Sequence, residues 1–456
     1  MISFLLNRKK IVTQEMPGMT LLDFIRYNQH LMGTKIGCRE GDCGACTVLI
    51  GKFHGDDVKY ISMTSCLTPL INVQGCHVVT VEGINGDTLT PVQESVLEEG
   101  GTQCGFCTVG FVMSMTGVCM TDDIPSTEKI IASIDGNICR CTGYKSLERA
   151  AHRISQLLQT SEEEPRINWL IREGFLPGYF SSVAEQLREL TLTVDDNTQG
   201  ILTGGGTDLY VQKQESMMHA AIRPVLNNSS LKSIEEKENE IIIGSAVTVE
   251  ELKNSALLNA LFPDLQQHLK LVSSTPIRNM ATIAGNFVNA SPIGDMTIFF
   301  LALNASLTLN HNGNRRNLLL KDFYKGYKTF DKKEGEMIVS LSIIKPGKDF
   351  HFSFEKVSKR THLDIASVNT AISFNLIENI LSDVHASMGG VFAFPKYLSQ
   401  TVDFLNGKSV NDAIIKEALT ILQKEISPIS DARGSKEYKR LLAQQLFIAH
   451  FQTANS

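Results

Sequence analysis

The spacing of hydrophobic and polar positions changes along the chain, and these changes predict several domains rather than one. The first 80 residues show short apolar runs of strand length, which are typical of a small α/β unit. A polar break at 7–9 predicts a β-hairpin, and Thr20 followed by Asp23 is typical of a helix start. Strands are expected at 3–6, 10–14, 47–50 and 78–81, with a helix from 20 to 27.

Residues 90–158 have a different pattern, in which apolar positions recur at helical spacing. They predict short helices packed antiparallel, two of them at 127–133 and 146–158. The polar, charged run 159–167 contains one proline and predicts a linker. Beyond it the pattern mixes helices and strands, with strands expected at 350–357, 367–376 and 382–388. The predicted division is 1–82, 83–158, the linker 159–167, 168–345 and 346–456.

Composition narrows the class of protein. With 456 residues, 43% of them hydrophobic and 20% charged, the chain has enough apolar side chains for several cores. A net charge of −6 gives no reason to expect a nucleic-acid partner. No apolar run reaches the ~18 residues that a membrane span needs, and the nearest candidate is 298–305. The N-terminus lacks the features of a signal peptide, so we expect a cytoplasmic protein with no membrane partner.

The ten cysteines are the strongest chemical signal, because none of them follows Cys141. A disulfide framework is disfavoured in the reducing cytosol, whereas metal ligation explains the clustering. Four of the ten follow the spacing C-x4-C-x2-C with one distant partner, which is the spacing of a plant-type ferredoxin loop around a [2Fe–2S] cluster. Zinc is the alternative, although its sites usually show two short pairs. The four are Cys38, Cys43, Cys46 and Cys66.

A second set of cysteines lies in the helical region. Cys104 and Cys107 form one pair and Cys139 and Cys141 another, separated by a long interval. Two pairs make zinc a more serious competitor here, but C-x-C matches the common zinc spacings poorly, so spacing alone leaves both metals open. Cys76 and Cys119 fall outside both sets and are expected to be ordinary buried thiols.

Two runs of small residues in the cysteine-free region suggest a cofactor that contains phosphate. Residues 201–209 read as a strand, three glycines and an acid, and residues 278–286 lead into a second acid at Asp295. Consecutive glycines expose backbone N–H groups and leave room for a diphosphate. Each run alone is weak evidence, because most glycine runs are plain turns.

Residues 103–107 (QCGFC) and 136–144 (GNICRCTGY), downstream of a ferredoxin-like loop, resemble the two-cluster part of the molybdenum hydroxylases. The resemblance implies a β-grasp [2Fe–2S] domain and a helical-bundle [2Fe–2S] domain whose cluster faces a molybdopterin cofactor. It also implies a two-part α+β FAD domain of the vanillyl-alcohol-oxidase-like type. Val109 departs from the family, which commonly has proline there.

By the same resemblance, the glycine runs and three single residues contact FAD. The expected cofactor-binding residues are Leu202, Thr203, Gly204, Gly205, Gly206, Thr207, Asp208, Leu209, Thr282, Ile283, Ala284, Gly285, Asn286, Asp295, Ile338 and Lys356. We find no Ser–His–Asp set, H-E-x-x-H motif or P-loop, so no catalytic residue is assigned to this chain.

The resemblance implies a function in electron transfer. Electrons would pass from molybdenum to the Cys104 set, then to the Cys38 set, then to FAD and finally to NAD. No residues remain for a molybdenum domain, so we expect a large molybdenum-cofactor-binding subunit, in a heterotetramer or larger assembly. Fusion of both cluster domains to the flavin domain is similar to purine-oxidising members of the family. The alternatives are a member acting on aldehydes or N-heterocycles, and a stand-alone iron–sulfur flavin reductase.

Overall fold

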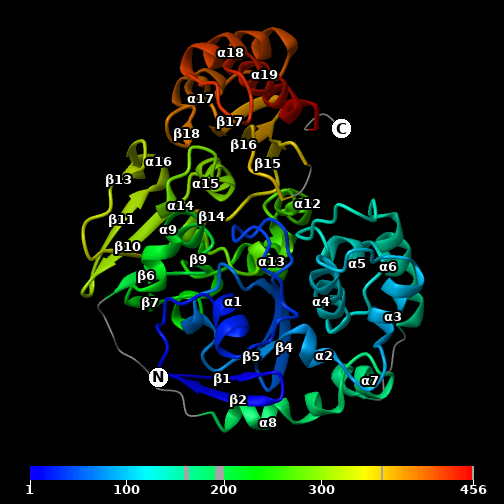
Figure 1. Cartoon of the computed structure of the whole chain (residues 1–456). Coiled ribbons are helices and arrows are strands. Elements are labelled where there is room, and N and C mark those ends of the chain that lie inside the picture. Colours follow the sequence, from blue (N-terminus) through cyan, green and yellow to red (C-terminus); the bar gives the residue numbers. More distant parts are fainter. Residues whose placement is uncertain (159–163, 191–199, 361–362, 454–456) are drawn as a thin grey trace. The chain divides into compact units, whose positions relative to one another are not determined.

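The computed structural model describes residues 1–158, 164–190, 200–360 and 363–453. The chain divides into two compact units (Figure 1). Unit one consists of Met1–Asn227 and Ser274–Ala281, and unit two of Asn228–Ser273 and Thr282–Ser456. Most of the expected linker, residues 159–163, lies outside the described residues. Its last two residues differ from the expectation, because helix α7 (Arg166–Arg172) begins there.

Unit one begins with a five-stranded sheet, drawn in blue in Figure 1. The strands are β1 (Ile2–Leu6), β2 (Lys9–Thr13), β3 (Thr47–His54), β4 (Asp57–Thr64) and β5 (His77–Val79), in the order β2-β1-β5-β3-β4. β1 and β5 are parallel and the other pairs antiparallel. Their apolar residues pack on α1 (Leu21–Asp23) and the π-helix η1 (Phe24–Asn28), with Phe4, Leu22 and Val48 fully buried.

The first hairpin is tighter than expected. Leu6 pairs with Lys9, so Asn7 and Arg8 alone form the turn. Asn7 has a φ of 53°, the left-handed conformation that two-residue hairpin turns of this kind require and that asparagine tolerates. The second strand therefore starts one residue before the expected position.

The expected helical region is present in unit one. It contains α2 (Val81–Ile84), α3 (Pro91–Glu98), α4 (Thr108–Cys119), α5 (Thr127–Ser133) and α6 (Lys145–Leu157). Thr90 and Gln93 form a capping box at the start of α3. Val109 lies in the first turn of α4, where a proline is tolerated but not needed, so the departure from the family pattern leaves the helix intact. α4 is buried on nearly all sides and packs against β3.

The rest of unit one brings distant segments together. α7, the 3₁₀ turn η3 (Gly178–Ser182) and α8 (Val183–Arg188) precede two short parallel strands, β6 (Ile201–Thr203) and β7 (Ile222–Pro224). α9 (Leu209–Met218) connects these strands. The short helix α13 (Thr275–Arg278) also belongs to this unit, as part of segment 274–281, although the residues before and after that segment belong to unit two.

Unit two contains two larger antiparallel sheets and the two-stranded sheet β12-β13. The first larger sheet has the order β11-β10-β14-β9-β8. The part of the unit up to Ile344 holds this sheet, the β12-β13 pair and several short helices. Its elements are η4 (Ser229–Leu231), β8 (Ile234–Lys237), β9 (Glu240–Gly244), α10 (Val249–Lys253), α11 (Ala256–Leu261), α12 (Leu265–Lys270), α14 (Ile283–Asn289), α15 (Asp295–Leu301), β10 (Ser306–His311), β11 (Asn314–Leu319), α16 (Leu320–Phe323), β12 (Tyr324–Gly326), β13 (Thr329–Phe330) and β14 (Met337–Ile344).

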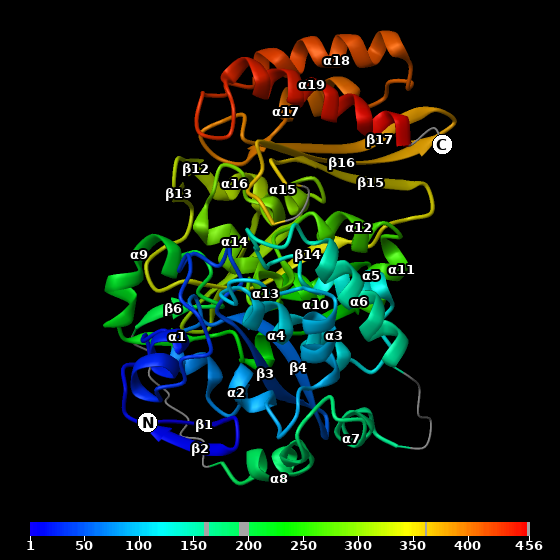
Figure 2. The same ribbon diagram turned by 45° about the vertical axis from the view of Figure 1, so that its right-hand side comes forward.

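The second sheet follows the order β15-β16-β17-β18. Figure 2 shows the helices α17 (Ser399–Leu405), α18 (Asp412–Glu425) and α19 (Lys436–Thr453) on one face of it, while α15 packs on the same sheet from the other face. The apolar residues Phe374, Leu422 and Phe447 belong to the core beneath those three helices. The elements are β15 (Phe350–Val357), β16 (Val368–Ile377), β17 (Ile380–Gly389), β18 (Lys396–Tyr397), α17 (Ser399–Leu405), α18 (Asp412–Glu425) and α19 (Lys436–Thr453). Among all described helices, none is long and apolar enough to cross a membrane.

Candidate iron–sulfur and flavin sites

The four cysteines of the first set lie together in unit one, as two pairs. The thiols of Cys38 and Cys43 hydrogen-bond each other, and those of Cys46 and Cys66 do the same. The amide N of Cys38 lies 3.4 Å from Sγ of Cys43, and the amide N of Glu40 lies 3.3 Å from Sγ of Cys38. The bond with the Cys43 thiol, together with the amides of Glu40, Cys43 and Asp42, lowers the pKa of Cys38 to about 5, and the same bond raises the pKa of Cys43. The loop therefore stabilises a thiolate at Cys38.

The loop is held in shape by a charge pair. The Arg39 guanidinium donates two hydrogen bonds to the Asp23 carboxylate, at 2.7 and 3.0 Å. The amide of Asp23 donates a hydrogen bond to the hydroxyl of Thr20, the N-cap residue of α1. The pair between Arg39 and Asp23 therefore anchors the cysteine loop to the start of that helix. Bidentate pairs of this kind fix geometry as well as adding energy.

The second set also forms two pairs in unit one. Sγ of Cys141 lies 3.7 Å from Sγ of Cys104, and the thiols of Cys107 and Cys139 hydrogen-bond each other. Burial raises the pKa of Cys139, but hydrogen bonds from the hydroxyl and amide of Thr142 and from the amide of Cys141 outweigh it and bring that pKa to about 7. Cys104 and Cys141 are exposed, whereas Cys139 is buried.

The pairing of thiols bears on the choice between zinc and iron. A zinc ion draws four ligands around one centre, whereas a [2Fe–2S] cluster needs two thiolates on each of two irons. In both sets the four thiols lie as two separate pairs. Within the described ranges, no three His, Cys, Asp or Glu side chains are arranged to hold one metal ion. Backbone N–H groups pointing at sulfur suit the bound thiolates. The chemistry of both donor sets therefore fits a [2Fe–2S] cluster.

The first glycine run forms a strand, a tight turn and a helix start in unit one. Thr203 ends β6, and Gly206 has a φ of 85° before α9 begins at Leu209. A Cβ on Gly205 would overlap the carbonyl oxygen of Met280, so only glycine fits there. The N–H groups of this glycine turn can receive a phosphate. The helix α9 that follows is interrupted at Lys213, whose φ and ψ are not helical, so only a short helical turn lies next to the glycine run.

The second run lies in unit two, where Thr282 caps α14 by accepting a hydrogen bond of 3.2 Å from the amide of Gly285. Asn286 is fixed by α15, since its Oδ1 accepts hydrogen bonds of 3.0 Å from both the amide and the hydroxyl of Thr297. Ile283 is fully buried and packs into the core, whereas Ala284 and Gly285 are only partly buried. Thr297 was not predicted as part of this site, because it is a single polar residue in the apolar helix α15.

Asp295 and Lys356, expected as separate cofactor contacts, are ion-pair partners in unit two. Asn369, which the sequence reasoning missed, donates a hydrogen bond of 2.5 Å to Oδ1 of Asp295. Ile338 is 3% exposed and lies on β14 opposite Leu309 of β10, inside the first sheet of the unit. Its side chain is thus a core residue of that sheet.

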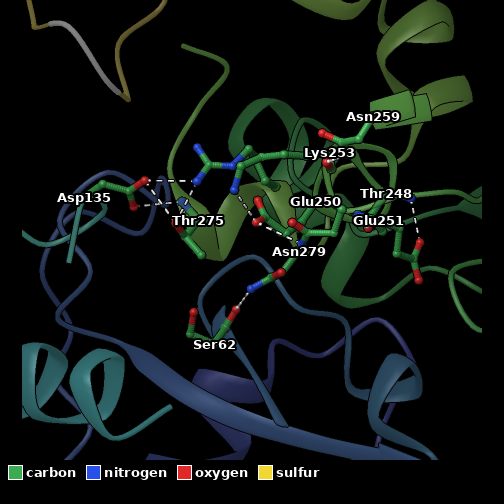
Figure 3. Close-up of polar contacts among 11 residues, drawn as sticks. Ser62, Asp135, Thr248, Glu250, Glu251, Lys253, Asn259, Thr275 and Asn279 are labelled. Atoms are coloured by element: carbon green, nitrogen blue, oxygen red, sulfur yellow. Dashed lines mark hydrogen bonds and ion pairs between the residues drawn. The ribbon is translucent and has the colours of Figure 1, made fainter. Parts of the chain in front are cut away.

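Segment 274–281 packs on three parts of unit one: Gly41 of the first cysteine loop, Gly136 just before the second, and Gly205 of the first glycine run. Figure 3 shows Thr275 donating to Asp135, by its amide at 2.8 Å and its hydroxyl at 3.0 Å. Arg278 completes a buried pair with the same carboxylate at 3.1 Å. In the same view, Asn279 donates to the carbonyl oxygen of Ser62 at 2.8 Å. Separately, in unit two, Lys253 and Glu250 form an ion pair of 2.7 Å.

Four family descriptions match successive parts of the chain. Residues 4–70 match a 2Fe-2S iron-sulfur cluster binding domain, and residues 80–152 match a [2Fe-2S] binding domain. Residues 178–345 match the FAD binding domain in molybdopterin dehydrogenase, and residues 353–454 match the CO dehydrogenase flavoprotein C-terminal domain.

Curated relatives include a xanthine dehydrogenase of Oryza sativa subsp. japonica, 30% identical over 97% of this chain and 39% of that protein. A xanthine dehydrogenase/oxidase of Mus musculus is 28% identical over 99% of this chain and 38% of its own length. The chain thus spans about two fifths of the curated relatives that it matches.

Solved structures that share the fold of just over half of this chain are more distant in sequence. A chain of the reconstituted CO dehydrogenase from Oligotropha carboxidovorans is 22% identical with a TM-score of 0.52, over 55% of this chain and 88% of that one. A chain of quinoline 2-oxidoreductase from Pseudomonas putida 86 is 22% identical with a TM-score of 0.51, over 56% of this chain and 88% of that one.

Proposed function

We propose that this chain, whose successive parts match two [2Fe–2S] domains and the FAD binding domain in molybdopterin dehydrogenase, is the electron-transfer subunit of a molybdenum hydroxylase, a xanthine dehydrogenase. The proposed reaction oxidises hypoxanthine or xanthine at a molybdenum centre on a partner chain. NAD is the proposed final acceptor. When bound, the clusters supply one-electron steps and FAD connects these to a two-electron hydride transfer.

The observation that carries the proposal is the pairing of thiols in two adjacent loops. We assign Cys38 with Cys43 and Cys46 with Cys66 to one cluster, and the remaining two pairs to the other. The chain's own residues hold the sulfur atoms, point amide N–H groups at them and bury one member of the second set, Cys139.

The exposed side of the second cysteine set supports a partner chain. Cys104 and Cys141 are exposed, and Phe106 and Tyr144 beside them expose 46% and 38% of their surface. A surface with exposed thiols beside large exposed apolar side chains is typical of one that a partner protein covers. We propose that the molybdenum-cofactor-binding subunit covers this face, within a heterotetramer or larger assembly.

The assignment of substrate rests on two observations. The curated relatives above carry the name xanthine dehydrogenase, and in this chain the cluster and flavin domains are joined in one polypeptide. A second candidate, an equivalent subunit acting on another N-heterocycle, is supported by the fold shared with quinoline 2-oxidoreductase.

The test is purification of the native assembly under anaerobic conditions, with identification of the chain that co-elutes. We expect a molybdenum-containing partner, about four irons and one FAD per copy of this chain, and NADH formation from hypoxanthine. Activity with quinoline but not hypoxanthine would select the second candidate. An isolated chain that oxidises NADH without any partner would indicate a stand-alone flavin reductase, and zinc in place of iron would overturn the proposal.

A further inference from the structure

The side chain of Asn137 bridges two cysteine-bearing segments of unit one. It is 5% exposed, and its Nδ2 atom donates a hydrogen bond of 3.1 Å to the carbonyl oxygen of Gly44, in the first cysteine loop. Its Oδ1 atom accepts a hydrogen bond of 2.8 Å from the hydroxyl of Ser114, in the middle of α4. The donor and the acceptor of the Asn137 side-chain amide therefore bond to two different segments of the unit.

The backbone next to Asn137 makes a parallel connection. The amide of Ile138 donates a hydrogen bond of 3.0 Å to the carbonyl oxygen of Cys43. Ile138 directly precedes Cys139, so one hydrogen bond and a few covalent bonds join a cysteine of the first set to a cysteine of the second. The carbonyl oxygens of Cys43 and Gly44 therefore both face the segment that carries Asn137.

Two glycines make this close approach possible. A Cβ on Gly44, whose φ is 66°, would overlap the Asn137 amide and the carbonyl oxygen of Gly136. A Cβ on Gly110, in the first turns of α4, would overlap the carbonyl oxygen of Gly44. The first cysteine loop is thus pressed against α4 and residues 136–138 with no room for a side chain between them.

Asparagine is suited to this position because it has a donor and an acceptor on one rigid plane. Aspartate has no donor for the Gly44 carbonyl and would place a charge in a buried environment. The Gly44 oxygen also accepts a hydrogen bond of 2.7 Å from the hydroxyl of Thr47, so losing Asn137 leaves that oxygen bonded. Removal of Asn137 should therefore loosen the contact between the loops without unfolding either one.

We propose that Asn137 is a positioning residue that sets the separation of the two cysteine loops, and with it the electronic coupling between the clusters assigned under the proposed function, on which this inference rests. The step it controls moves a single electron, so that one cluster is oxidised as the other is reduced, and no bond or proton is exchanged. Coupling of this kind falls steeply with separation, so a shift of about 1 Å matters, as it does for other reacting groups.

The experiment compares the wild-type holo-complex with Asn137→Ala and with the matched control Ser133→Ala. Ser133 is also buried and polar, but within the described residues its hydroxyl donates to the carbonyl oxygen of Ile130 in the same helix, α5, and not to another segment. The first readout is the magnetic interaction between the two reduced clusters in EPR spectra. The second is the hydrogen-exchange rate of the Ile138 amide, which does not depend on turnover. The third is flavin reduction by purine and, separately, by NADH.

We expect Asn137→Ala to keep about four irons and its FAD, to weaken the magnetic interaction, and to speed exchange at Ile138 at least tenfold. Flavin reduction by purine should slow at least tenfold, while reduction by NADH stays unchanged. Ser133→Ala should match the wild type in all of these. If the magnetic interaction and the exchange rate are unaltered in Asn137→Ala, the proposal is overturned. Loss of iron would also overturn it, because Asn137 would then be required for cluster binding and not for positioning.

A second variant covers the case in which Asn137→Ala fails to fold. Ser114→Ala removes the partner of Oδ1 but leaves the bond to Gly44, and we expect a smaller change in the same direction. No change in Ser114→Ala would then overturn the proposal. If wild-type protein holds no iron, the proposed function fails. If it holds iron but the variants behave as wild type, only the role of Asn137 fails.

Discussion

The Nζ atom of Lys356 lies 2.7 Å from Oδ2 of Asp295, and the lysine side chain is 1% exposed. The lysine also donates a hydrogen bond of 2.8 Å to the carbonyl oxygen of Leu271. By the resemblance to the molybdenum hydroxylases, these two residues were predicted as separate contacts of FAD. In the folded chain they form one buried pair, so a single substitution changes charge balance as well as any cofactor contact.

Asp295→Ala should therefore destabilise unit two by about 3–5 kcal/mol, because it leaves a buried ammonium group without its carboxylate. The double variant Asp295→Ala/Lys356→Met removes both charges and should recover most of that loss. Denaturant unfolding measures stability, and bound FAD is measured on the same samples. If the double variant is stable and holds FAD fully, the proposed contact between Asp295 and the flavin is wrong.

Gly205→Ala should lower FAD content and stability together, because the added Cβ would overlap the carbonyl oxygen of Met280 and push the first glycine run out of place. The matched control is Gly178→Ala, in the same unit, where an added Cβ meets no atom. The measurement is flavin bound per chain after desalting. Full FAD occupancy in Gly205→Ala would contradict the assignment of this loop to the cofactor.

Cys104→Ser should remove the second cluster and lower iron by about two atoms per chain, as expected for one of two [2Fe–2S] sites. The control is Cys119→Ala, because Cys119 is a buried thiol of α4 that belongs to neither set. Metal analysis decides the result, and flavin reduction by purine should stop in Cys104→Ser alone. Iron loss in the control would show that the proposed ligand set is incomplete.

The fold class, the two [2Fe–2S] domains and the FAD domain were predictable from sequence, and the family matches confirm them. These features depend on local patterns, such as the spacing of cysteines and the alternation in β15 (Phe350–Val357). Local patterning missed the π-helix over Phe24–Asn28, because apolar residues at helical spacing do not distinguish the two helix types. The substrate and NAD remain proposals.

Long-range relationships were not predictable. Asn369 reaches Asp295 across 74 residues, and Asn137 reaches Gly44 across 93. Residues 274–281 join unit one although the residues before and after them belong to unit two. Periodicity reports only which face of an element is apolar, so it carries no information about such partners. The residues that hold the sites in place were therefore visible only in the folded chain.

Unit one should lose stability in mild acid because of His77, which is fully buried. Its Nε2 faces the carbonyl oxygen of Asn7 at 2.9 Å and its Nδ1 faces the hydroxyl of Tyr60 at 2.8 Å, so the neutral ring is satisfied. Burial lowers the pKa of His77 from 6.5 to about 4, and between these values the unfolded chain binds the additional proton. Stability from this group is complete above pH 6.5 and falls by about 3 kcal/mol as pH drops to 4.

His77→Gln should lose this part of the pH dependence, whereas His54→Gln, at an exposed position, should keep it. The only tryptophan, Trp169, is 4% exposed and lies in the core of unit one, so its fluorescence follows the unfolding of that unit. Denaturant unfolding at pH 7 and at pH 4.5 gives the difference for each protein. Because cluster loss in acid affects all three proteins alike, the comparison between variants isolates His77. If His77→Gln and the wild type show the same pH dependence, the prediction is wrong. The His77 ring would then already be charged, or accessible to water, in the folded state.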